Sequence, residues 1–313
     1  MTATPIRLGT RGSALALAQA GAVAKRLGAE LVVIESDGDR QTGSLSSLGG
    51  SGVFAAALRE SLLRGEVDAV VHSYKDLPTA PTAGLTVVAI PKRADARDAL
   101  CARDGLTLAT LPEGARVGTG SPRRRAQLLA ARPDLDVLDI RGNVDTRLAR
   151  VGSDDPDRHL DAVVLAAAGL DRLERPEAVS QFLELDDWPT APAQGALAIE
   201  VRTDGLDTVD HRLRAIVKLD HRNTRLAVEA ERGVLAQLEA GCSAPIAAHA
   251  LFDDGLLFLS ARVYALDGSA MLTSSHALYP EDVSDPAADL AERVATELLA
   301  AGAAELAPLG RQL

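Results

Sequence analysis

The sequence predicts an α/β protein of two lobes with mainly parallel sheets, followed by a smaller α+β domain with a three-stranded antiparallel sheet. Strand-like runs alternate with helical patterns between residues 6 and 202, which is typical of βαβ units. Two connections, residues 91–97 and 189–195, are interpreted as crossovers between two such lobes. After residue 223 the order changes to one long helix, three alternating strands and a closing helix, which indicates an antiparallel sheet with helices on one side.

Length and composition exclude several classes of protein. The 313 residues are enough for two or three domains, and no apolar run approaches the roughly 20 residues that cross a bilayer. The N-terminus lacks the layout of a secretory signal, and two cysteines are too few for a disulfide framework, so a reducing cytoplasm is expected. A formal charge of -11, with one Trp, three Tyr and four Phe, disfavours nucleic-acid binding. Any anion site must therefore be a local cluster of arginines.

The first lobe begins with a short strand at residues 6–8 and a helix at 14–27, which Ser13 caps and Gly28 ends. After a second strand at 31–35, ten of the 17 residues from 36 to 52 are Ser or Gly. A loop of this length is either a working lid or a flexible surface loop. A helix resumes at 53–64.

Polar side chains follow the next strand, residues 68–72, and Pro78 prevents its regular continuation. The run is Ser73-Tyr74-Lys75-Asp76. Ligands of doubly wound sheets bind beyond the carboxyl ends of strands, so these groups are candidates for a site, with a solvated turn as the alternative. A cleft aspartate such as Asp76 can stabilise a developing cation and exchange a proton, although an ion pair with a neighbouring Arg or Lys is equally open.

A glycine-rich turn opens a helix in the second lobe. The run Gly118-Thr119-Gly120-Ser121 precedes Pro122, and the helix continues to residue 131. Its first turn carries Arg123 and Arg124, where the helix dipole disfavours positive charge, so an anionic ligand is their best physical rationale. A solvated basic face is the alternative, and the spacing excludes a P-loop.

Further strand ends in this lobe also present arginine. The predicted strand at 136–140 is followed by Arg141 and Arg147. Another strand is predicted at 161–166. The strand predicted at 196–202 is expected to return to the sheet of the first lobe. Together with Arg11 in the first lobe, the guanidinium groups of these arginines suit a ligand with many carboxylates or phosphates.

The last third of the chain is predicted as a helix at 223–240 that ends at Gly241, strands at 245–252, 257–266 and 270–279, and a helix at 286–306. Asp254-Gly255 and Asp267-Gly268 are hairpin signals. Three domains are predicted. The first consists of residues 1–92 and 194–214 and includes the loop at 36–52, the second of residues 93–193, and the third of residues 215–313.

The two cysteines differ in their surroundings. Cys101 lies in an apolar strand and is interpreted as a core residue, whereas Cys242 stands in a turn between Gly241 and Pro245. The end of a helix does not lower a thiol pKa, which favours a single permanent attachment over rapid thiolate turnover. A buried, inert thiol remains the alternative. No metal-ligand spacing, nucleophile elbow or dinucleotide fingerprint is present.

Six ordered motifs resemble the porphobilinogen deaminase (hydroxymethylbilane synthase) family over essentially the whole chain. They are Gly9–Ala16, His72–Pro78, Val117–Arg124, Arg141–Arg147, Ala193–Ala196 and Glu239–Ile246. The resemblance implies a cytoplasmic monomer of three domains, the first two like periplasmic binding proteins. It implies a transferase of porphyrin, or haem, biosynthesis that joins four porphobilinogen molecules head to tail with loss of ammonia and releases 1-hydroxymethylbilane.

The resemblance also implies roles for individual residues. A dipyrromethane cofactor is expected as a thioether on Cys242, with Asp76 and Lys75 as catalytic residues. Further cofactor contacts are implied for Ser73, Lys75, Asp76, Gly120, Ser121, Arg123, Arg124 and Arg147. Substrate contacts are implied for Arg11, Ser13, Arg141, Arg147 and Gln194.

The chain departs from the family pattern at four positions. Ser51 and Ala56 stand where many relatives carry lysine, Pro122 replaces a common leucine and Tyr74 a common methionine or leucine. A non-catalytic anion-binding protein would account for the lobes and arginines but not for Cys242 or the third domain. A relative that no longer loads its cofactor is the second alternative.

Overall fold

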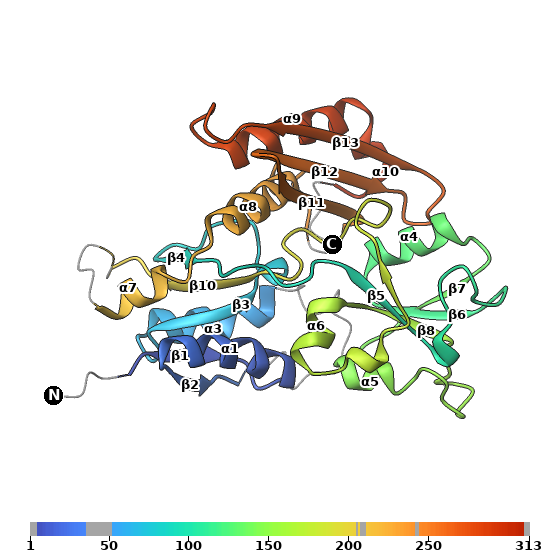
Figure 1. The fold of residues 1–313 in the computed structure, drawn as a ribbon, viewed down its shortest axis with the longest axis horizontal. Coiled ribbons are helices and arrows are strands. Elements are labelled where there is room, and N and C mark those ends of the chain that lie inside the picture. The colour runs from blue at the N-terminus through green and yellow to red at the C-terminus, as the bar shows by residue number, and fades with distance from the viewer. Residues whose placement is uncertain (1–4, 36–51, 205, 207–210, 242–243, 310–313) are drawn as a thin grey trace. The chain divides into compact units, whose positions relative to one another are not determined.

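A computed structural model describes residues 5–35, 52–204, 206, 211–241 and 244–309 (Figure 1). The chain divides into two compact units, one of residues 1–94 with 196–225 and the other of residues 95–195 with 226–313. The three-domain boundaries predicted above stay a prediction. The segment 36–51, Ser51 and Cys242 lie outside the described residues. No helix in the described part of the chain is long and apolar enough to cross a membrane.

The first unit contains a five-stranded sheet in the order β2-β1-β3-β10-β4. The strands are β1 (Arg7–Thr10), β2 (Glu30–Val33), β3 (Ala69–Ser73), β4 (Leu85–Ala89) and β10 (Leu197–Arg202). β1 pairs in parallel with β2 and β3, whereas β10 is antiparallel to both β3 and β4. Four strands therefore run one way and β10 runs against them, which confirms both the mainly parallel lobe and the return of residues 196–202 to it.

Two helices cover opposite faces of this sheet. α1 (Ala14–Leu27) packs with Val71, whereas α3 (Gly52–Leu63) packs with Val70. Successive strand residues face opposite ways, so the two valines assign the helices to different faces. A third helix in this unit, α7 (His211–Val217), was not predicted from the sequence.

The second unit repeats the same plan in the order β7-β6-β8-β5-β9. The strands are β5 (Asp98–Ala102), β6 (Arg116–Thr119), β7 (Asp136–Asp139), β8 (Ala162–Ala166) and β9 (Gln181–Leu183). β6 is parallel to β7 and β8, while β5 is antiparallel to β8 and β9. Helices α4 (Pro122–Ala131), α5 (Val144–Leu148) and α6 (Ala167–Arg172) follow the carboxyl ends of β6, β7 and β8.

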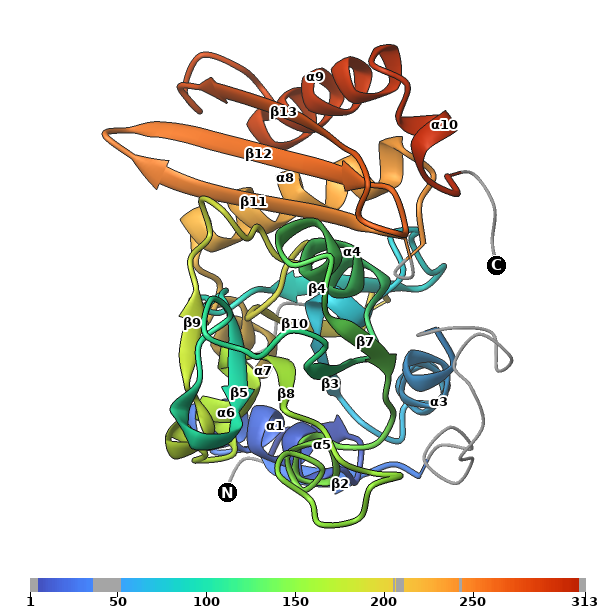
Figure 2. The same ribbon diagram turned by 90° about the vertical axis from the view of Figure 1, so that its right-hand side faces the viewer.

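A three-stranded antiparallel sheet is visible in Figure 2, and its residues belong to the second unit. It consists of β11 (Ile246–Asp253), β12 (Leu256–Tyr264) and β13 (Met271–Leu278). Apolar residues of α8 (Arg222–Gln237) and α9 (Pro286–Ala300) share one core with these strands. Asp254 and Gly255 at one hairpin turn, and Gly268 at the other, have positive φ angles, as the two predicted hairpins require.

One predicted helix end and the continuity of one predicted helix were wrong. α8 ends at Gln237, because Glu239 adopts a left-handed conformation (φ 50°) and the Ala240 amide donates to the Leu235 carbonyl at 2.9 Å. Gly241 is therefore not the residue that ends the helix. The predicted helix at 286–306 is divided into α9 and α10 (Ala303–Leu306) by Gly302, whose φ is 97°.

Candidate functional site

The predicted site residues fall into two groups, one in each unit. The first unit holds Arg11, Ser13, Ser73, Lys75 and Asp76. The second unit holds Gly120, Ser121, Arg123, Arg124, Arg141, Arg147 and Gln194. Each group is described within its own unit.

The polar run after β3 forms a single turn of 3-10 helix, Tyr74–Asp76, at the carboxyl end of the strand. The buried Tyr74 fixes this turn, because its amide donates to the carbonyl of Ala196 at 3.0 Å. Asp76 is exposed and has no ion-pair partner among the described residues, so the ion-pair alternative finds no support there. Its carboxylate is available to an incoming ligand.

Arg11 and Ser13 follow the carboxyl end of β1, which lies beside β3 in parallel. Ser13 caps α1 as predicted, its hydroxyl accepting a hydrogen bond from the Ala16 amide at 3.3 Å. Parallel neighbours end at the same edge of a sheet, so this pair and the Asp76 turn share one edge of the first sheet. Ala56, one of the two positions where the resemblance led us to expect lysine, is exposed on α3.

The glycine-rich turn in the second unit is tightly built. A β-carbon on Gly120 would lie 2.7 Å from the carbonyl oxygen of Ile140, so no larger residue fits without a shift of backbone. Ser121 caps α4, its hydroxyl accepting from the Arg124 amide at 3.4 Å, and its own amide donates to the Thr119 hydroxyl at 3.2 Å. The sequence correctly predicted this cap and Pro122 at the first helical position.

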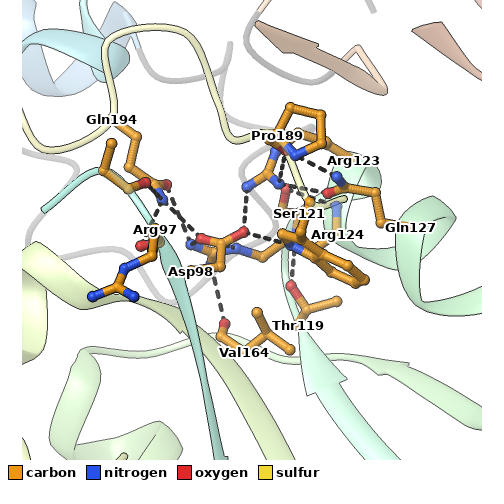
Figure 3. A network of polar contacts seen from close by, with 12 residues as sticks. Arg97, Asp98, Thr119, Ser121, Arg123, Arg124, Gln127, Val164, Pro189 and Gln194 are labelled. Carbon is orange, nitrogen blue, oxygen red and sulfur yellow. Dashed lines mark hydrogen bonds and ion pairs between the residues drawn. The ribbon is translucent and has the colours of Figure 1, made fainter. Parts of the chain in front are cut away.

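Arg123 and Arg124 point into the protein and share one carboxylate, that of Asp98 (Figure 3). Arg123 donates from Nη2 to Asp98 Oδ2 at 2.9 Å, and Arg124 donates from Nη2 to Oδ1 at 2.7 Å and from Nε at 3.1 Å. Only 3% of the Arg123 side chain and 8% of the Arg124 side chain are exposed. The alternative of a solvated basic face is therefore wrong for this pair.

Two more donors complete the surroundings of Asp98. Gln194 donates from Nε2 at 2.8 Å and Trp188 from Nε1 at 3.0 Å (Figure 3 shows the Gln194 contact). Gln194 is fully buried, and its amide also donates to the carbonyls of Ala96 and Arg97, so its predicted substrate contact remains a prediction. Sequence reasoning missed Asp98 and Trp188.

Three further arginines lie in the segments that follow β7 and β8 in this unit. Arg141 pairs with Asp139 at 3.1 Å. Arg147 donates to the carbonyl of Gly142, and burial together with the charges of Arg124 and Arg141 lowers the pKa of its guanidinium. Burial also lowers the pKa of Arg172, which sequence reasoning missed although Gly169-Leu170-Asp171 was noted beyond the same strand.

This arrangement of charge suits an anion. Arg124 and Arg141 both repel the charge of Arg147, and a bound carboxylate would relieve that repulsion. Arg123 also retains a buried Nε–H without a hydrogen-bond partner among the described residues. Both observations fit a ligand that carries several carboxylates, as a dipyrromethane assembled from porphobilinogen would.

The fold and the site define an α/β protein with arginines near its strand ends and a C-terminal three-stranded antiparallel sheet. Residues 6–210 match the family described as "Porphobilinogen deaminase, dipyromethane cofactor binding domain", and residues 225–300 match its C-terminal domain. The chain is 58% identical to a porphobilinogen deaminase of Leifsonia xyli, over 97% of this chain and 94% of that one. It is 50% identical to one of Cutibacterium acnes, over 97% of both chains.

Among solved structures, the chain is similar to a nutrient binding protein from Burkholderia cenocepacia bound to methionine. The TM-score is 0.39 at 15% identity, over 68% of this chain and 90% of that one, which adds nothing to the assignment.

The chain belongs to the porphobilinogen deaminase family. It is a tetrapyrrole-building transferase of porphyrin biosynthesis with a dipyrromethane cofactor-binding domain.

Proposed function

We propose that the chain condenses four porphobilinogen molecules head to tail, with release of ammonia, and then releases 1-hydroxymethylbilane. The observation that carries this proposal is the set of cationic groups at the strand ends of a chain that matches the family over both of its domains. Each porphobilinogen adds two carboxylates, so a lengthening chain needs several guanidinium groups to balance its charge.

Cys242 is proposed as the anchor of the dipyrromethane. The other thiol is unsuited to this role, because Cys101 is only 2% exposed and burial raises its pKa to about 12. When bound, the cofactor supplies the free pyrrole position to which the first substrate unit is joined. The residues proposed to hold it are Ser73, Lys75, Asp76, Gly120, Ser121, Arg123, Arg124 and Arg147.

Asp76 is proposed as the group that acts at each addition, with Lys75 beside it. Loss of ammonia from the substrate leaves a cation, which a fixed carboxylate stabilises electrostatically. The exposed carboxylate of Asp76 sits in a turn that the Tyr74 amide holds in place, which supports this role. Substrate contacts are proposed for Arg11, Ser13, Arg141, Arg147 and Gln194.

A cytoplasmic monomer is also proposed. Two cysteines, one of them buried and free, suit a reducing compartment. The proposed domain boundaries are those predicted from the sequence.

Asp76→Asn tests the mechanism. The wild-type protein is expected to consume porphobilinogen and release ammonia. The variant is expected to retain cofactor and substrate binding. Its turnover is expected to be slower by a factor on the order of a hundred or more, because a neutral amide cannot stabilise the cation. Rates of ammonia release and the intact masses of both proteins give the result.

The matched control is Asp68→Asn, at the amino end of the same strand, where the carboxylate pairs with Arg7. This substitution is expected to lower stability without a comparable loss of turnover. Near-normal turnover of Asp76→Asn would remove Asp76 from the mechanism.

A further inference from the structure

Asp98 is a fully buried carboxylate that receives hydrogen bonds from four side chains (Figure 3 draws those from Arg123, Arg124 and Gln194). The fourth donor is the indole of Trp188. The two arginines come from the first turn of α4, whereas Trp188 and Gln194 come from the segment that leaves this lobe. One carboxylate thus joins two separate chain segments to β5.

The orientation of both guanidinium groups depends on these contacts. Arg124 meets one oxygen of Asp98 through two nitrogens, and its Nη1 donates to the Val164 carbonyl at 3.0 Å. Arg123 meets the other oxygen, and its Nη1 donates to Gln127 Oε1 at 2.6 Å and to the Pro189 carbonyl at 3.2 Å. A planar guanidinium group that is hydrogen-bonded on both sides cannot rotate without breaking several hydrogen bonds.

The charges at this point do not balance. Two guanidinium groups face a single carboxylate, so one unit of positive charge is left over in a buried place. An arginine carries five N–H donors, and Asp98 with its neighbours does not use all of them. Arg123 Nε is buried without a partner among the described residues.

We propose that Asp98 is a positioning residue, which fixes the guanidinium groups of Arg123 and Arg124 and neutralises one of their two charges, so that the pair takes one ligand carboxylate. This inference rests on the proposed function, in which these arginines hold carboxylates of the dipyrromethane, to which the first porphobilinogen is joined. Without Asp98, two buried like charges repel each other and both guanidinium groups lose their fixed orientation.

Asp98→Ala in the holoenzyme tests the proposal. The variant leaves a space of carboxylate size lined by four donor side chains, which formate fills with the correct charge. We expect the KM for porphobilinogen to rise on the order of ten- to a hundredfold with a smaller change in kcat, as displaced binding groups cause. Added formate is expected to restore most of the KM, whereas formamide, of similar size but uncharged, is not.

The matched control is Asp161→Asn. Asp161 is a buried carboxylate in the same lobe and forms an ion pair with Arg103 at 2.8 Å. It lies at the amino end of β8, whereas Asp98 lies opposite Ala166, at the carboxyl end of that strand. Asp161→Asn is expected to lower stability without changing KM, and formate has no effect on it. Wild-type protein with formate controls for competition at the substrate site.

If no Asp98 variant yields folded holoenzyme, Trp188→Phe tests the positioning role of Asp98 instead. It removes one neutral donor to Asp98 and keeps a buried ring, so KM is expected to rise roughly two- to tenfold. An unchanged KM in Trp188→Phe and in every folded Asp98 variant would overturn the proposal. Equal rescue by formate and formamide, or none by either, would also overturn it.

Arg147→Gln separates this inference from the proposed function. Arg147 makes no ion pair with Asp98 but belongs to the same cationic set. If its removal leaves KM unchanged, carboxylate binding by this set is wrong. If its removal raises KM while Asp98 variants do not, only the positioning role is wrong.

Discussion

At the scale of the residue, opposing influences act on the Asp98 carboxyl. Burial alone raises its pKa, but the charges of Arg123 and Arg124, with hydrogen bonds from Arg124 and Gln194, outweigh burial and hold the pKa well below its usual range. The carboxylate therefore stays ionised in the folded protein at every pH where the enzyme could work. In the unfolded chain it has the ordinary value of about 4.

This difference makes a prediction for stability against pH. Because the pKa is lower in the folded state, Asp98 contributes stability above about pH 4 that is lost progressively as the pH falls further. Asp98→Asn is expected to lower the free energy of unfolding by about 3–5 kcal/mol at pH 7, and by less as the pH approaches 3.

Urea denaturation at pH 7, 5, 4 and 3 measures this difference. Leu128→Ala, a buried apolar truncation in α4, is the control, because its cost does not depend on protonation. A constant gap between wild type and Asp98→Asn from pH 7 to pH 3 would contradict the ionised state assigned to Asp98.

The sequence predicted part of this site, for reasons visible in particular residues. Ser121, Pro122 and the two arginines follow a parallel strand and open a helix, so cap chemistry and the strand-end rule locate them. Asp98 begins an antiparallel strand, and its amino end reaches the same edge of the sheet only because β5 is reversed beside β8. No local pattern signals that reversal, and the burial of the arginines depends on it.

At the scale of the element, α4 is the helix of the second lobe that contacts the three-stranded sheet. Its Gln127 donates to the buried Tyr264 hydroxyl at 3.2 Å and accepts from Arg123. The hairpin between β12 and β13 meets the same helix, because a β-carbon on Gly268 would lie 2.6 Å from the Ala126 carbonyl oxygen. Helix ends were less predictable than helices, since Glu239 takes a left-handed conformation that glycine usually occupies.

Gly268→Ala tests this contact. The methyl group would meet backbone atoms of α4, so the variant is expected to lose about 1–3 kcal/mol of stability beyond the cost of its positive φ. Gly114→Ala supplies that cost alone, because its φ is 73° and nothing lies within 4 Å of the added β-carbon. Thermal unfolding of both variants gives the comparison, and equal losses would show that the hairpin does not press on α4.

At the scale of the whole molecule, the second lobe and the three-stranded sheet belong to one compact unit. Pro245 stands three positions after the proposed anchor at Cys242 in the sequence, and its carbonyl accepts from the Tyr264 amide at 3.0 Å. Tyr264 in turn contacts Gln127, which holds Arg123. The segment that follows the anchor and the buried arginines are therefore joined within a single unit by hydrogen bonds.

The α/β lobes and the antiparallel sheet were predictable from hydrophobic periodicity and from two Asp-Gly turns. The grouping of the second lobe with the third sheet was not, because it depends on contacts such as Gly268 against α4, between residues distant in sequence. Sequence patterns report local structure and the faces that will be buried, but they do not report which buried faces meet.

The intact mass of the purified protein under denaturing conditions tests the proposed cofactor anchor most directly. The wild-type chain is expected to be heavier than its sequence by two linked pyrrole units. Cys242→Ser is expected to have the unmodified mass and no turnover, while Cys101→Ser keeps the excess, because Cys101 is buried in the core. An active wild-type protein with an unmodified mass would contradict the cofactor anchor at Cys242.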